Sequence, residues 1–242
     1  MHRFLITSGA PGETVCLSQA EALHARRVLR LKPGDSVQLI DGGGALFAAE
    51  LVEVGVRVAA RLIGLLPGAR APVGLTLYQG LPKFDKLEFL VQKAAELGAA
   101  RIVPVKMSRS VVRLSAAEGA KKRERLDRIA REAMKQCGRA DAVEVLEPLG
   151  FDEALQMLSR EEVMLMPWES ARGFHMRDAH AQCPGARSLG ILVGPEGGIS
   201  QAEADAAAAV GALAVTLGPR ILRAETAAVA AMAVAMHLWG DL

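Results

Sequence analysis

The chain has 242 residues, of which 51% are hydrophobic, so it is long enough for two domains and for a large core without stabilising cross-links. Cys16, Cys137 and Cys183 are an odd number, lie far apart and form no C-x-x-C pair, so they indicate neither a disulfide framework nor a zinc site and favour reduced thiols. Because the first residues lack the apolar core of a signal peptide and no apolar run has the length of a membrane span, we expect a soluble cytoplasmic protein.

Positive charge is concentrated in the middle of the chain. Residues 101–139 contain twelve Lys or Arg and four Asp or Glu, although the formal net charge of the whole chain is only +2. Such segregation indicates a polyanionic partner on one face of the molecule. The alternative is a solvated helical face, which is the most frequent origin of a charge run.

The first 70 residues have the pattern of short paired strands. Alternating stretches span residues 37–40, 46–54 and 56–65, and glycine-containing turns separate them. Proline and glycine at residues 67–72 then mark a boundary. We therefore predict a compact β domain at residues 1–70 and a second domain at residues 71–242.

Beyond residue 70, buried strands alternate with helices. Strands are predicted at residues 75–79, 102–105, 163–166, 189–193 and 214–217. Apolar stripes predict helices around residues 87–94 and 126–134, and Ser200 with Glu203 forms a capping box at the start of another helix. This alternation predicts an α/β fold with a mostly parallel sheet covered by helices on both faces.

Three segments that follow predicted strands are candidates for a site, because ligands of open α/β sheets bind at the carboxyl ends of the strands. They span residues 194–198 (Gly-Pro-Glu-Gly-Gly), 218–226 and 167–170. Neither glycine-containing segment has a dinucleotide or P-loop signature, and each alone is most often a structural turn. Together, with Glu196 in one and two arginines in the other, they favour a ligand site.

His175, His180 and Cys183 lie close together in the sequence and are candidate metal ligands. No second pair of ligands with matching spacing lies nearby. We therefore predict a surface loop at these residues and no metal.

Residues 194–198 and 217–227, taken together, form a longer signature. It resembles the cofactor signature of the SPOUT methyltransferases, and in particular that of the RsmE family. Further segments agree with this family in the same order, at residues 24–30, 81–83, 93–98, 109–112 and 136–139. The resemblance implies a SPOUT-type α/β knot, with a deep trefoil knot and a mostly parallel sheet, preceded by a small PUA-like β-barrel that binds RNA.

The resemblance also implies an activity. It implies an S-adenosylmethionine-dependent enzyme that methylates N3 of one uridine in 16S ribosomal RNA of the small subunit, and a homodimer with no metal and no membrane association. One alternative is a SPOUT enzyme that modifies another base or a ribose 2′-hydroxyl of rRNA or tRNA, which the ordered agreement upstream disfavours. A second alternative is a ribosome assembly factor without catalysis, which the intact Glu196 and Arg223 disfavour.

Glu196 and Arg223 are the candidate catalytic residues. Methylation at N3 requires loss of the N3 proton, so Glu196 either accepts that proton or positions a water, or instead locks its loop to backbone N–H groups. Arg223 either stabilises negative charge or holds the cofactor carboxylate. The predicted cofactor-binding residues are Met166, Gly194, Pro195, Glu196, Gly197, Gly198, Leu217, Gly218, Ile221, Leu222, Arg223 and Ala224. The predicted RNA-binding residues are Arg26, Arg27, Arg30, Lys83, Arg109, Lys121, Lys122, Arg123 and Arg139.

Overall fold

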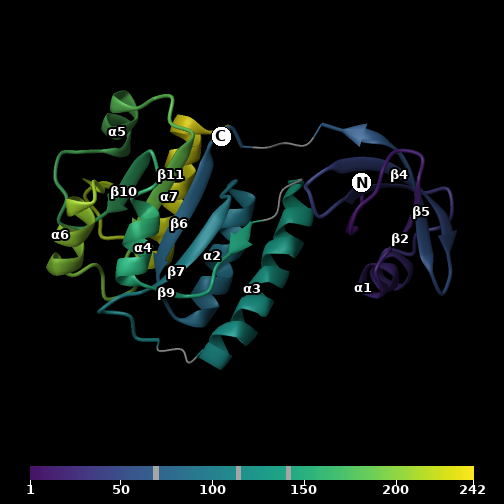
Figure 1. Ribbon diagram of the computed structural model, residues 1–242, viewed down its shortest axis with the longest axis horizontal. Coiled ribbons are helices and arrows are strands. Elements are labelled where there is room, and N and C mark those ends of the chain that lie inside the picture. The colour runs from purple at the N-terminus through teal and green to yellow at the C-terminus, as the bar shows by residue number, and fades with distance from the viewer. Residues whose placement is uncertain (68–70, 113–115, 140–142) are drawn as a thin grey trace. The chain divides into compact units, whose positions relative to one another are not determined.

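The computed structural model of the protein describes residues 1–67, 71–112, 116–139 and 143–242. The chain divides into two compact units, which Figure 1 shows with their elements. The first unit comprises Met1–Arg70 with Met134–Ala142, and the second comprises Ala71–Ala133 with Val143–Leu242. Within the described residues, no helix is long and apolar enough to cross a bilayer.

The first unit is built on a five-stranded sheet. Its elements are β1 (Arg3–Leu5), β2 (Thr14–Cys16), α1 (Gln19–Leu23), the π-helix η1 (His24–Val28), β3 (Ser36–Ile40), β4 (Leu46–Val54) and β5 (Val58–Leu66). The strand order is β1-β3-β4-β5-β2, in which β1 and β3 are parallel and the other pairs are antiparallel. Alternate apolar residues of the strands, among them Leu39, Leu51 and Leu62, pack into one core with Phe4 and Phe47. The three strands predicted between residues 37 and 65 are confirmed to within two residues.

The second unit is an α/β structure. Its elements are β6 (Gly74–Gly80), α2 (Phe84–Glu96), β7 (Arg101–Lys106), α3 (Ala116–Cys137, whose end groups with the first unit), β8 (Glu144–Val145), β9 (Leu149–Gly150), α4 (Phe151–Leu158), β10 (Val163–Pro167), α5 (Met176–Gln182), β11 (Ser188–Val193), α6 (Gln201–Ala209), β12 (Leu213–Val215) and α7 (Ala224–Trp239). The strand order is β12-β10-β11-β6-β7-β8, β9 also pairs with β7, and all these pairings are parallel. The predicted α/β class with a mostly parallel sheet is confirmed.

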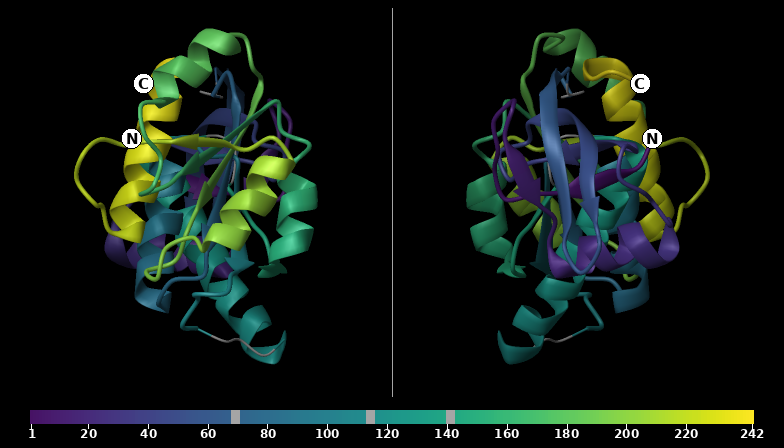
Figure 2. Two further views of the ribbon diagram at one scale, coloured as in Figure 1. Left: turned by 90° about the vertical axis from the view of Figure 1, so that its left-hand side faces the viewer. Right: turned by 90° about the vertical axis from the view of Figure 1, so that its right-hand side faces the viewer.

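Helices cover both faces of this sheet. Figure 2 shows α2 and α7 on one side and α4 and α6 on the other. The apolar stripe of α2 packs with α7 and one face of the strands, whereas α4 and α6 pack with the opposite face in a separate cluster. Strands buried on both faces are continuous apolar runs, as Leu189 to Val193 illustrates. This layering brings the carboxyl ends of β10, β11 and β12 to the same edge of the sheet.

Two predictions differ from the structure. The strand expected at residues 214–217 is β12, which ends at Val215, and Thr216 instead forms an isolated bridge with His175. The surface loop expected around His180 is the helix α5. The helix starts there because the N–H of His175 donates to the carboxylate of Asp178 at 2.8 Å, a capping contact between residues only three apart in the sequence.

Candidate functional site

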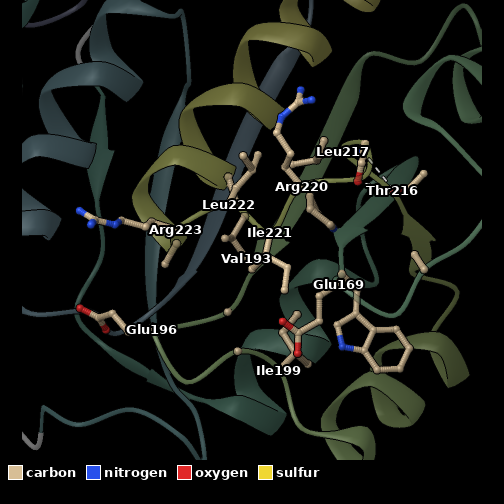
Figure 3. Close-up of a pocket in the computed structure, with 18 of the residues that line it drawn as sticks. Glu169, Val193, Glu196, Ile199, Thr216, Leu217, Arg220, Ile221, Leu222 and Arg223 are labelled. Carbon is tan, nitrogen blue, oxygen red and sulfur yellow. Dashed lines mark hydrogen bonds between the residues drawn. The ribbon is translucent and has the colours of Figure 1, made fainter.

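A cavity of about 870 Å³ lies at the carboxyl ends of β10, β11 and β12. Its walls come from the three loops that follow these strands, from the start of α7 and from Lys86 of α2. Figure 3 shows Glu196 and Arg223 on one side of the cavity and Glu169 and Thr216 on the opposite side. The cavity therefore occupies the position at which open α/β sheets bind ligands.

The loop at residues 194–198 is held by contacts from neighbouring segments. The side-chain amide of the buried Gln79 donates to the carbonyl of Gly194 at 3.1 Å, and Arg109 donates to the carbonyl of Gly197 at 3.1 Å. Gly198 has a φ of +74°, which favours glycine, and its N–H donates to the carbonyl of Pro195 at 2.9 Å. The loop is therefore a tight, braced turn that exposes backbone to the cavity.

Close packing also explains the glycine at the end of β6. A Cβ at Gly80 would lie 2.6 Å from the nitrogen of Pro195 and 2.7 Å from the sulfur of Met107. Only a residue without a side chain lets β6 approach the start of the cavity loop this closely. Gly80 thus contributes to the shape of the site although it lies outside the loop.

The loop at residues 216–223 forms another wall. The N–H of Thr216 donates to the carbonyl of Phe174, which joins this loop to the one after β10. The hydroxyl of Thr216 accepts from the N–H of Gly218 at 3.2 Å. Ile221 is 84% exposed, although it is a large apolar residue that lines the cavity. Its side chain is therefore available to a ligand or partner.

Glu196 lies at the amino-terminal end of α2. Its Oε1 accepts the N–H of Lys83 at 3.1 Å and lies 3.3 Å from the ammonium of Lys86. Burial opposes ionisation, but hydrogen bonds from its own N–H and that of Lys83, together with Lys86, hold the pKa of Glu196 below its usual value. Glu196 is therefore a stabilised carboxylate.

Lys86 also pairs with Glu225 in the first turn of α7, at 3.0 Å. Contact with Glu225 is the largest cause of a raised pKa for Lys86; burial opposes it and Glu196 adds to it. The pKa of Glu225 is lowered, because its own N–H, Lys86 and the charge of Arg223 outweigh burial. All three groups are consequently ionised at neutral pH.

The structure brings eleven of the twelve predicted cofactor residues together as cavity wall. The exception is Met166, which is buried in the core cluster of α4 and α6, while the following Pro167 lines the cavity. Both predicted catalytic residues, Glu196 and Arg223, are in the wall. The roles assigned to these positions stay predictions.

The predicted RNA-binding residues are distributed over both units. Exposed members of the set are Arg26, Arg27, Arg30, Lys83, Arg109, Lys121 and Arg123. Lys122 is half-buried, with its ammonium 4.6 Å from the ring centre of Phe84. Arg139 is only 8% exposed, so it is a poor candidate for contact with a phosphate backbone. The exposed members retain the access that RNA contact requires.

The cavity wall also contains residues outside the predicted cofactor-binding set. Some of them belong to neither candidate segment at 167–170 or 218–226, namely Lys86, Ala171, Arg172, Gly173, His175, Val193, Ile199 and Thr216. The others, Pro167, Trp168, Glu169, Pro219, Arg220 and Ala227, lie in or beside those segments, and their signal was that they follow predicted strands. Lys86 had none, since a lysine in the first turn of an amphipathic helix is ordinarily solvated.

Known proteins match this arrangement along most of the chain. A family model described as an RNA methyltransferase domain matches residues 69–236, and one described as an RNA methyltransferase PUA domain matches residues 17–55. The ribosomal RNA small subunit methyltransferase E of Bacillus subtilis is 33% identical over 220 residues, which are 88% of this chain and 86% of that protein. The chain belongs to this methyltransferase family.

Solved structures of family members agree with the fold. The ribosomal RNA small subunit methyltransferase E of Neisseria gonorrhoeae, bound to S-adenosylmethionine, is 34% identical, with a TM-score of 0.90 over 100% of this chain and 99% of that one. A methyltransferase of Legionella pneumophila in complex with the same cofactor is 31% identical, with a TM-score of 0.90 over 99% and 98% of the two chains. The predicted family and the SPOUT-type fold with a PUA-like first part are confirmed.

Proposed function

We propose that this protein transfers the methyl group of S-adenosylmethionine to N3 of one uridine in the 16S ribosomal RNA of the small subunit. The observation that supports this most directly is the cavity built from residues 194–198 and 216–224 in a chain of this methyltransferase family. The family relation supports small-subunit rRNA as the substrate. The choice of N3 follows from the resemblance of the motifs.

The residues of the cavity fit the proposed cofactor. A volume of about 870 Å³ is in the range of small-molecule sites. The glycines of both loops let backbone N–H and C=O groups approach a nucleoside, and Trp168, Ile199 and Leu217 supply apolar surface. When bound, S-adenosylmethionine supplies the methyl group as part of a sulfonium cation.

The protein's own residues would act on the uracil ring. N3 of uridine is protonated at neutral pH, so its lone pair becomes available only when the proton leaves and negative charge spreads to the flanking carbonyl oxygens. Arg223 is exposed at the cavity wall and is placed to stabilise that charge. Glu196 already accepts the N–H of Lys83 and pairs with Lys86, so we assign it the locking role, with water as the proton acceptor.

The two parts of the chain would have separate functions. We assign residues 1–70 to RNA binding as a PUA-like domain and residues 71–242 to catalysis. The exposed basic residues of the predicted set would contact the phosphate backbone, with the target base flipped into the cavity. A cytoplasmic homodimer is part of the proposal. It is supported by the small side chains of α7, which allow another helix to approach closely.

Transfer to small subunits that lack this modification tests the function. Purified protein is incubated with such subunits and isotopically labelled S-adenosylmethionine, and the RNA is digested to nucleosides for mass spectrometry. We expect one labelled N3-methyluridine per subunit. Label on a ribose or on another base, or no transfer by folded protein, would overturn the proposal.

A further inference from the structure

One lysine connects two of the loops that line the cavity. Lys86 lies in the first turn of α2, and its Nζ is 3.3 Å from Glu196 and 3.0 Å from Glu225. Glu196 belongs to the loop after β11, and Glu225 lies in the first turn of α7, the helix that follows the loop after β12. The side chain of Lys86 is only 24% exposed and itself lines the cavity. The contact thus joins three separate segments at one ammonium.

Two carboxylates share this ammonium. Because both lie close to the same nitrogen, their contacting oxygens are no more than about 6.3 Å apart, a distance at which like charges repel. The amino-terminal ends of α2 and α7 carry partial positive charge that favours the ionised carboxylates, and the ammonium of Lys86 supplies the full positive charge that lies between them. Without the ammonium, repulsion would push the loop at 194–198 away from the start of α7.

The other hydrogen bonds that hold the loop at 194–198 come from segments other than α7. Gln79 and Arg109 hold the carbonyls of Gly194 and Gly197, and these two hydrogen bonds do not involve α7. Lys83 holds Glu196 through its backbone N–H, which a change of its side chain would leave in place. Among the ion pairs of the described residues, those of Lys86 are the ones that join the 194–198 loop to α7.

We propose that Lys86 is a positioning residue that sets the separation of the loops at 194–198 and 216–223, and thereby the affinity of the cavity for its cofactor. It acts through Glu196 and Glu225. This inference rests on the proposed function only for the identity of the ligand, S-adenosylmethionine.

Calorimetric titration with S-adenosylmethionine tests the proposal on Lys86→Met, Lys86→Arg and the full-length parent. We expect Lys86→Met to raise the Kd at least tenfold, because the two carboxylates lose their shared cation. Lys86→Arg keeps the charge and is expected to stay within threefold of the parent. In the transfer assay, Lys86→Met should raise the KM for the cofactor much more than it lowers kcat at saturating cofactor.

Lys93→Met is the matched control. Lys93 lies on the same helix, is similarly exposed and pairs with Glu96 at 2.7 Å, but it is not part of the cavity wall. The control loses one ion pair of α2 and is expected to bind the cofactor like the parent. Equal affinities for Lys86→Met and the parent, or equal losses for Lys86→Met and Lys93→Met, would overturn the proposal.

A double variant separates repulsion from a general loss of structure. Adding Glu225→Gln to Lys86→Met removes one of the two facing carboxylates, so affinity should recover in part. If Lys86→Met does not fold, Glu225→Gln alone still tests the link, with an expected rise in Kd of about threefold, and an unchanged Kd contradicts it. Failure of the folded parent to bind S-adenosylmethionine would instead count against the proposed function.

Discussion

The environment of Glu196 bears on the choice between its two predicted roles, holding its loop and accepting a proton. A general base is most effective when its pKa lies near the working pH. The pKa of Glu196 is shifted the other way, since N–H groups and Lys86 stabilise the carboxylate more than burial destabilises it. The same contacts tie its loop to α2. At the scale of a single residue, the structure therefore favours a role in which Glu196 holds its loop in place over a role as proton acceptor.

The variant Glu196→Gln tests this distinction. Glutamine can still accept the N–H of Lys83, but it cannot take up a proton or form an ion pair with Lys86. We expect the Kd for S-adenosylmethionine to rise several-fold, while kcat at saturating cofactor falls less than about tenfold and the pH profile keeps its shape. A proton acceptor would show a loss of about 10²-fold to 10⁴-fold and a missing acidic limb in the profile of kcat against pH.

At the scale of an element, α6 anchors the segment that contains Arg109. Glu203 is only 7% exposed and accepts the N–H of Ser200 at 2.9 Å, as the predicted capping box requires. It also accepts the N–H of Ser108 at 2.7 Å, a long-range contact. One carboxylate thus caps the helix and fixes the start of the Arg109 segment.

Glu203 makes the stability of the second unit sensitive to acid. Burial alone would raise its pKa, but hydrogen bonds from Ser108 and Ser200 lower it below the usual 4.5. The folded protein therefore binds fewer protons at this site than the unfolded chain, so the stabilisation is complete above about pH 4.5 and is lost as the pH falls through the lower, folded-state pKa.

The variant Glu203→Gln tests this contribution by urea unfolding between pH 7 and pH 3.5. The amide can satisfy fewer of these donors, so we expect a loss of about 1–3 kcal/mol at pH 7 and a shallower decline on acidification. Glu153→Gln is the control, because Glu153 caps α4 in an exposed position with the N–H of Gly150. A Glu203→Gln variant as stable as the parent at pH 7 would contradict the assignment.

How well these features could be predicted from the sequence depends on how far apart in the sequence their contacting residues lie. The loops at 194–198 and 216–223 were predictable because glycines follow buried strands, and the capping box at Ser200 because both partners lie within one turn. Lys86 was not, because its two partners are more than 100 residues away in sequence. The strands β8 and β9 have two residues each, too few for a hydrophobic period. Arg139 was expected to be accessible, and only tertiary packing explains its burial.

At the scale of the whole molecule, the positive charge of residues 101–139 is only partly available to a polyanion. Arg123 lies 3.3 Å from Glu147, and Arg125 lies 2.6 Å from Glu88. Lys122 stacks on Phe84. The two ion pairs reduce the net charge that α3 presents, and the contact with Phe84 leaves the ammonium of Lys122 less accessible. Lys121 is exposed and outside these pairs. We therefore expect Lys121 to contribute a larger share of RNA binding than its single charge among the basic residues of α3 suggests.

The salt dependence of RNA binding tests this view on residues from both units. Each cation that neutralises a phosphate contributes about 0.7–0.9 to the slope of log K against log salt concentration. We expect Lys121→Ala and Arg27→Ala each to lower the slope by about that amount, as fluorescence anisotropy with a small-subunit RNA fragment would measure between about 50 and 300 mM salt. Arg101→Ala removes the same charge at the amino end of β7, where Arg101 pairs with Glu144 at 2.7 Å, and should leave the slope unchanged. If all three variants kept the parent slope, Lys121 and Arg27 would not contact phosphate. If all three lowered it equally, the attraction would arise from the overall charge of the protein and not from a defined basic surface.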